Sequence, residues 1–154
     1  MNITLSIDSE KPVQIKDSDI ANIVIFLDDD TCYASFYSKL LNHLSSEVRA
    51  AIAGKTTLPF DRLMELTVDV SVEVVRQLAC NTRALALFEL PQFQKMIHRD
   101  VSVAEYIADN LSSVSNGVRE DVIKILLKHT DPIVVKAVEN YIKYAEEVVD
   151  DETL

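Results

Sequence analysis

Apolar residues follow two different periods along this chain. At the N-terminus Ile3, Leu5 and Ile7 alternate with polar residues, and the alternation resumes at Val13 after a polar turn. A period of two is typical of a β-strand with one buried face. Residues 1–16 are therefore predicted to form a short β-hairpin or an extended arm. Because a hairpin is marginal alone in water, three hypotheses stay open: it packs on the helices, pairs with another chain, or is disordered.

From residue 17 to about 149 the apolar residues recur every three to four positions, which predicts a helical domain. Residues 150–154 are expected to be a disordered tail. Helix starts are expected near capping or first-turn residues, namely Asp17, Ser18 or Asp19, then Asp30 or Thr31, Ser45 or Ser46, Pro59, Ser71, Ser102 and Asp131. The apolar faces of these helices include Leu40, Leu44, Phe60, Leu63, Phe93, Val122 and Leu127.

Part of the helical region repeats itself. The segment that starts at Asp69 recurs at Asp100 and, more loosely, at Asp131, at intervals of 31 residues. Each copy ends at an asparagine, which suits a left-handed helix end or a side-chain bond to the next turn: Asn81, Asn110 and Asn140. A fixed period in this range indicates stacked supersecondary units. The predicted fold is all-α, a right-handed α-solenoid of about four helical repeats.

The string Asp-x-x-x-x-Val-Val-Arg-x-Leu-Ala-x-Asn, residues 69–81, resembles the leucine-rich repeat variant and the related HEAT-like α-solenoids. Residues 46–53 are similar to the second helix of the same repeat, and the resemblance extends over roughly 45–142. It implies a HEAT/armadillo-like scaffold or binding module and no particular partner. Some variant-repeat proteins carry an iron–sulfur cluster, but Cys32 and Cys80 cannot supply four thiolate ligands. No cofactor is expected.

Composition and charge narrow the classes of function. With two glycines in 154 residues, the chain has no glycine-rich phosphate loop and no dinucleotide fingerprint. A net charge of −10 argues against direct nucleic-acid binding and favours either simple solubility or a basic partner. The two cysteines are interpreted as free thiols in a reducing compartment. Neither a signal peptide nor a membrane-spanning run is evident, so a cytoplasmic protein with no membrane contact is expected.

Candidate chemistry is sparse. The acidic run at 28–30 lacks the ligand spacing of a calcium loop and is interpreted as a solvated helix junction. His98 and His129 occupy equivalent repeat positions, which repeat geometry explains as well as a metal or pH-sensing pair does. Neither Gly-x-Ser-x-Gly nor His-Glu-x-x-His occurs. The sequence therefore favours a protein that is not an enzyme and has no catalytic or metal site.

Solenoids bind along rows of side chains on successive second helices. The candidate partner-binding residues on these helices are Arg49, Glu73, Arg76, Glu105, Tyr106 and Lys136. The same mixed charge also fits a plain solvated face, and Tyr106 fits either an anchor or a core residue. The leading hypothesis is a non-enzymatic protein–protein interaction module or adaptor. The alternative is an acidic inhibitor, of the immunity type or a nucleic-acid mimic, that blocks a basic partner. Self-assembly through the N-terminal arm is a third hypothesis.

Overall fold

The computed structural model describes residues 3–5 and 11–151. This part of the chain is mostly helical, with a small antiparallel pair of strands at its start. β1 (Thr4–Leu5) pairs with β2 (Val13–Gln14), and the Ile15 N–H donates to the Ile3 carbonyl at 3.0 Å. The predicted strand pair is thus present, whereas Ile7 and most of the predicted turn lie outside the described residues.

The chain comprises two compact units, residues 1–78 and 79–154. After the strands, the first unit contains α1 (Asp17–Phe26), η1 (Thr31–Tyr33), α2 (Ala34–Leu40), α3 (Ser46–Ala53), α4 (Phe60–Leu66) and α5 (Val72–Ala79), whose last residue falls in the second unit. The second unit contains α6 (Thr82–Leu87), α7 (Leu90–Ile97), α8 (Val101–Asp109), η2 (Leu111–Ser113), α9 (Asn116–Leu126) and α10 (Pro132–Asp151).

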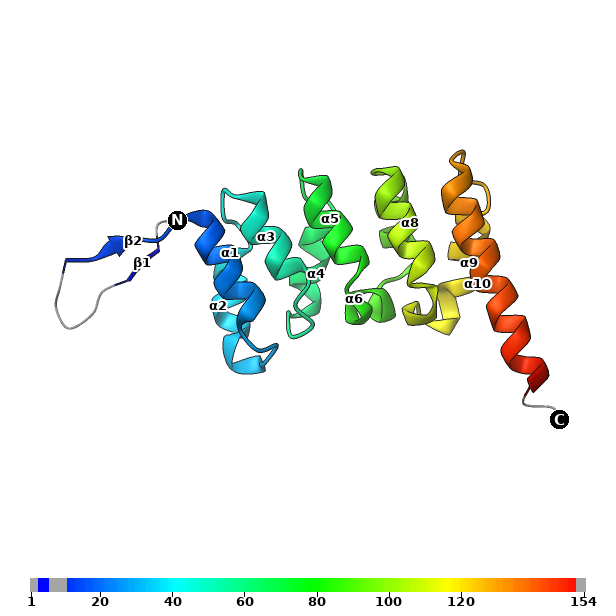
Figure 1. Cartoon of the computed structure of the whole chain (residues 1–154), viewed down its shortest axis with the longest axis horizontal. Helices are drawn as coiled ribbons and strands as arrows, with labels where there is room; N and C mark the ends of the chain where they lie inside the picture. The colour runs from blue at the N-terminus through cyan, green and yellow to red at the C-terminus, as the bar shows by residue number, and fades with distance from the viewer. Residues whose placement is uncertain (1–2, 6–10, 152–154) are drawn as a thin grey trace. The chain divides into compact units, whose positions relative to one another are not determined.

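In the first unit α3 is the central helix, because both α1 and α2 pack against it (Figure 1). The apolar residues at helical spacing on α1 and α3 are buried, and small residues among them allow the two helices to approach closely. The buried positions on these two helices are Ile20, Ala21, Val24, Val48, Ala50, Ile52 and Ala53. The core of this unit is therefore built by the amphipathic stripes that the sequence predicts.

In the second unit consecutive helix pairs stack in two layers. α7 packs against α9 in one layer, and α8 packs against α10 in the other. Figure 1 shows α8 and α10 as neighbours. Phe88 and Phe93 are buried in an edge-to-face contact, with ring centroids 6.2 Å apart. Ala79 and Ala108, the matching small residues of the repeat, are both fully buried. This layering gives a physical basis for the repeat, since each pair covers an apolar face of the next.

The three repeat aspartates make the same local hydrogen bond. In each case Oδ1 accepts from the backbone N–H two residues further on: Asp69 from Ser71 at 2.8 Å, Asp100 from Ser102 at 2.9 Å and Asp131 from Ile133 at 2.9 Å. Such side-chain bonds satisfy donors at the start of a helix that the helix itself leaves unpaired. The repeat of 31 residues is therefore a repeat of a helix-starting turn.

Three expectations about helix ends are corrected. Asp100, rather than Ser102, is the N-cap of α8, and Ser102 donates to it. Asn81 begins α6 by accepting from the Ala84 N–H, so a short helix was missed where only a helix end was expected. Asn140 does not end a helix, because α10 runs from Pro132 to Asp151 without a break.

Three residues assigned to apolar faces are exposed instead. Leu44 is 89% exposed because α2 ends at Leu40, which leaves Leu44 in the turn before α3. Phe60 is exposed at the first position of α4, and Leu127 is exposed directly after the last residue of α9. Leu44 and Leu127 lie beyond the ends of their helices, so the helical spacing does not apply to them. Phe60 is the first residue of its helix.

Candidate functional site

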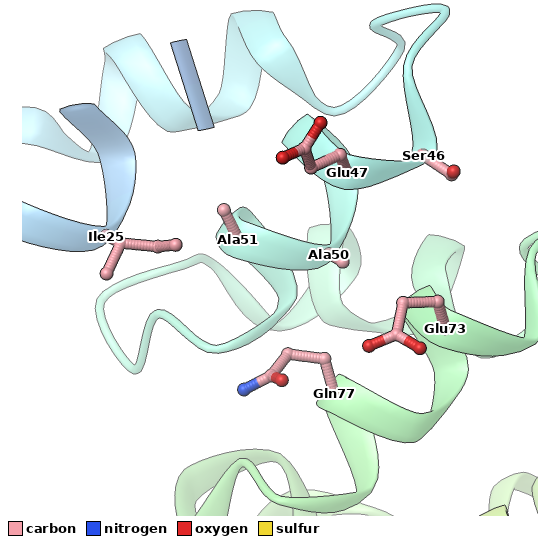
Figure 2. Close-up of a pocket in the computed structure, with 7 residues that line it drawn as sticks. All are labelled: Ile25, Ser46, Glu47, Ala50, Ala51, Glu73 and Gln77. Atoms are coloured by element: carbon pink, nitrogen blue, oxygen red, sulfur yellow. The ribbon is translucent and has the colours of Figure 1, made fainter. Parts of the chain in front are cut away.

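A groove on the first unit is formed by α1, α3 and α5 (Figure 2). It encloses about 470 Å³, which is within the range of ligand and side-chain pockets. Its lining side chains come from helices up to 52 residues apart in sequence, namely Ile25, Ser46, Glu47, Ala50, Ala51, Glu73 and Gln77. The groove therefore depends on how the three helices pack, and no continuous motif encodes it.

The floor of the groove is apolar. Ile25 projects from α1 and is 58% exposed, and Ala50 and Ala51 line the groove from α3 (Figure 2). Alanine at these positions leaves space that a longer side chain would fill. Gly54, directly after α3, leaves room for the groove residue Gln77. A Cβ at position 54 would lie 3.1 Å from the Gln77 amide nitrogen, and the Gln77 side chain would have to shift. Small residues thus keep the groove open.

The rim of the groove is acidic. Glu47 and Glu73 are exposed and stand in the first turns of α3 and α5. Glu73 is paired with Arg76 on the same helix, at an exposed site. Glu47 forms no ion pair with residues in the described ranges. The groove therefore presents at least one uncompensated carboxylate above an apolar floor.

Arg49 is the main ion-pairing residue behind the groove. Its Nε and Nη2 donate to the two carboxylate oxygens of Asp69 at 2.7 and 2.9 Å, and Nη1 donates to the carbonyls of His43 and Leu44. The Arg49 and Asp69 side chains are only 11% and 9% exposed. Hydrogen bonding to Asp69 raises the pKa of Arg49, although burial opposes this. The pair ties α3 to both the α2–α3 turn and the α4–α5 turn.

Asp29 ties the connection after α1 to the connection after α3. Its two carboxylate oxygens accept from the backbone N–H and the hydroxyl of both Thr56 and Thr57, at 2.6 to 3.0 Å. Partial burial raises the pKa of Asp29, but these four bonds outweigh it, and the net effect is a lowered pKa. Asp29 is exposed, in keeping with the solvated helix junction expected for the acidic run at 28–30, and its carboxylate also joins the two connections.

Lys55 and Tyr37 complete this connection. The buried Lys55 ammonium donates to the Leu27 carbonyl at 2.7 Å, just beyond the end of α1, and lies 5.6 Å from the centre of the Tyr37 ring. The Tyr37 hydroxyl donates to the Asp28 carbonyl at 3.0 Å. Burial raises the pKa of Tyr37, so the hydroxyl keeps its proton at neutral pH. The C-terminal ends of the groove helices α1 and α3 are therefore held together by polar contacts.

The predicted partner-binding residues divide between the two units. In the first unit, Glu73 lines the groove and Arg76 pairs with it, whereas Arg49 was expected to be exposed and is instead nearly buried against Asp69. The expected exposure of Arg49 is corrected: its side chain is 11% exposed and positions the Asp69 carboxylate and two turn carbonyls. The sequence analysis missed Ile25, Ala50 and Ala51 as groove residues, because an exposed isoleucine and two alanines carry no distinctive signal.

In the second unit, Glu105 is half-buried, and Tyr106 beside it on α8 is 40% exposed. Tyr106 therefore does not belong to the core. Lys136 is exposed and helps to line a shallow hollow with His129 and Glu139. The hollow contains one cation, one carboxylate and one imidazole, so neither positive nor negative charge predominates in it.

Two of the three histidines accept hydrogen bonds within turns between helices. His43 Nδ1 accepts from the Ser45 N–H at 3.2 Å, and His129 Nδ1 accepts from the Asp131 N–H at 3.1 Å, whereas His98 is exposed at the end of α7. Within residues 3–5 and 11–151, no three His, Cys, Asp or Glu side chains gather closely enough to hold a metal ion.

No protein-family model, no curated protein and no solved structure matches this chain. Among the described helices, none combines the length and the apolar character that crossing a bilayer requires.

Proposed function

We propose that this protein is a non-enzymatic protein–protein interaction module built on an α-solenoid of HEAT-like repeats. Support for the solenoid comes from the repeated helix-starting aspartates and from the stacking of α7 on α9 and α8 on α10. In such an array each helix pair is too small to bury its own apolar face and relies on its neighbours.

The observation that carries the proposed function is the open groove on α1, α3 and α5. Its floor exposes Ile25 next to two alanines, and its walls are held by the Asp29 and Arg49 contacts. A preformed groove lowers the cost of binding, since few side chains must be ordered when the partner arrives. Extended rows on the second helices of a solenoid are suited to bind a segment of another protein.

Filling the groove should remove partner binding. We expect the Ala51→Arg variant to retain less than about a fifth of the stoichiometric partner that the wild-type protein captures from lysate of its native host, because a long side chain would occupy the hollow. The matched control is Ala86→Arg, which makes the same chemical change at an exposed position on α6. Capture is quantified by mass spectrometry after a high-salt wash.

Three outcomes of this comparison are decisive. Loss with Ala51→Arg and retention with Ala86→Arg supports the groove as the binding site. Equal capture by both variants contradicts it. A basic partner that is lost from every variant at high salt would instead support the alternative function, an acidic inhibitor. Salt screens interactions between exposed charges beyond the Debye length, which falls from about 8 Å at physiological ionic strength to about 3 Å at 1 M salt.

A further inference from the structure

We propose that the groove on α1, α3 and α5 binds a segment of a partner protein in which lysine or arginine residues are interspersed with aliphatic ones. This inference rests on the proposed function and adds the chemistry of the occupant. Figure 2 shows the juxtaposition on which it depends: Glu47 and Glu73 stand on neighbouring helices, with Ile25 and Ala51 between α1 and α3.

The two cations on and just after α3, Arg49 and Lys55, do not neutralise the groove because both are engaged elsewhere. Arg49 lies two residues from Glu47, but residues at that spacing point to different sides of a helix, and its guanidinium is bound to Asp69 and to two carbonyls. Lys55 is buried and donates to the Leu27 carbonyl. Glu47 is thus left without an ion-pair partner among the described residues, next to the open groove.

Glu73 can exchange its partner at little cost. Its ion pair with Arg76 is exposed to solvent: the Glu73 side chain is 50% exposed and the Arg76 side chain is 38% exposed. Exposed pairs of this kind contribute little to stability. A lysine or arginine of a bound segment can therefore interact with Glu73 while Arg76 returns to solvent, and a second basic residue can interact with Glu47.

The floor selects the apolar part of the occupant. Ile25 leaves more than half of its surface exposed, and Ala51 beside it has no side chain long enough to cover it. An aliphatic side chain seated in the hollow of about 470 Å³ would bury this surface. The floor therefore adds to affinity through apolar burial, whereas the rim adds orientation and a faster rate of association.

A second copy of this chain is a poor occupant. Each copy carries a net charge of −10, so two copies repel each other electrostatically as they approach. A basic segment of another protein is attracted by the same field. Charge complementarity thus favours a partner of opposite sign.

The test uses a displayed library of random 12-residue peptides selected on the wild-type protein. We expect the enriched peptides to carry at least two basic residues together with aliphatic ones. Their affinity, measured by fluorescence anisotropy, should fall about tenfold in the double variant Glu47→Gln/Glu73→Gln, which loses two charge interactions. These exposed substitutions should leave the circular dichroism spectrum unchanged.

The matched control is Asp61→Asn/Glu65→Gln on α4, outside the groove. It removes the same two charges, and Glu65 is bonded to Arg62 just as Glu73 is bonded to Arg76. Affinity for the enriched peptides should change less than about twofold in this control. An equal loss in both double variants, enriched peptides without basic residues, or no enrichment at all would overturn the inference.

The two proposals fail in distinguishable ways. If Ala51→Arg removes the host partner but the charge variants do not weaken peptide binding, the groove is a binding site and the assigned occupant is wrong. If Ala51→Arg captures as much partner as Ala86→Arg does, the proposed function itself is wrong.

Discussion

Replacing Arg49 by methionine should lower the free energy of unfolding by about 3 kcal/mol, toward the lower end of the cost of breaking a buried ion pair. Methionine keeps most of the aliphatic stem and removes the guanidinium. The Asp69 carboxylate, which is 9% exposed, would then lose both of its Arg49 bonds, and the carbonyls of His43 and Leu44 would lose a donor. Unfolding in urea, followed by circular dichroism at 222 nm, measures the loss.

Arg76→Met provides the matched control for this prediction. It makes the same substitution on α5, but its ion pair with Glu73 is exposed. We expect a change of no more than about 0.5 kcal/mol, since exposed pairs contribute little. If the two variants lose similar amounts of unfolding free energy, the buried Arg49–Asp69 pair stabilises the fold no more than an exposed pair does.

Replacing Asp29 by asparagine should lower the free energy of unfolding by about 1 kcal/mol at pH 7, less than is typical of hydrogen bonds to a buried charged group, because Asp29 is exposed to water. Each Asp29 carboxylate oxygen accepts two hydrogen bonds from Thr56 or Thr57. An asparagine offers one oxygen and an NH₂ group, which cannot accept from the second pair of donors. Urea unfolding at pH 7 tests this loss.

The loss on Asp29→Asn should also depend on pH. Because the pKa of Asp29 is lowered from 3.8 in the folded protein, the carboxylate stabilises the fold fully above that value. The stabilisation is lost as pH falls through the lower, folded pKa, so the difference between wild type and variant should shrink once the pH is below 3.8.

Asp28→Asn is the control for charge alone. Its backbone carbonyl accepts from Tyr37, which the substitution does not alter. We expect the free energy of unfolding to change by no more than about 0.5 kcal/mol at pH 7. An Asp29→Asn difference that persists undiminished at low pH would contradict the role assigned to the carboxylate.

Much of the helical structure could be predicted from local sequence patterns. The aspartates at 69, 100 and 131 recur at a fixed interval, and each forms the same bond to the N–H two residues on. Such a bond is local, so its recurrence follows the repeat; the choice between Asp100 and Ser102 as the cap of α8 was still wrong, because both residue types are good N-caps. By contrast, the six-residue helix α6 was missed, because so short a segment shows less than two helical turns of periodicity.

The site was harder to predict because its contacts are not local. Arg49 shows the helical spacing of an exposed residue, yet its partner Asp69 is 20 residues away and buries it. Asp29 likewise reads as one member of a solvated acidic run until Thr56 and Thr57 are placed beside it. The groove needs Ile25, Ala51 and Gln77 on three packed helices. Periodicity assigns each residue to a face but does not say which distant residue covers it.

The central claim is that a partner binds in the groove on α1, α3 and α5, and site-specific photo-crosslinking in native host lysate tests it most directly. A benzophenone amino acid is placed at Gln77, which lines the groove, and separately at Gln94, which is exposed on α7. We predict a crosslinked adduct of one defined mass from position 77 and none of that mass from position 94. The same adduct from both positions, or an adduct from position 94 alone, would contradict it.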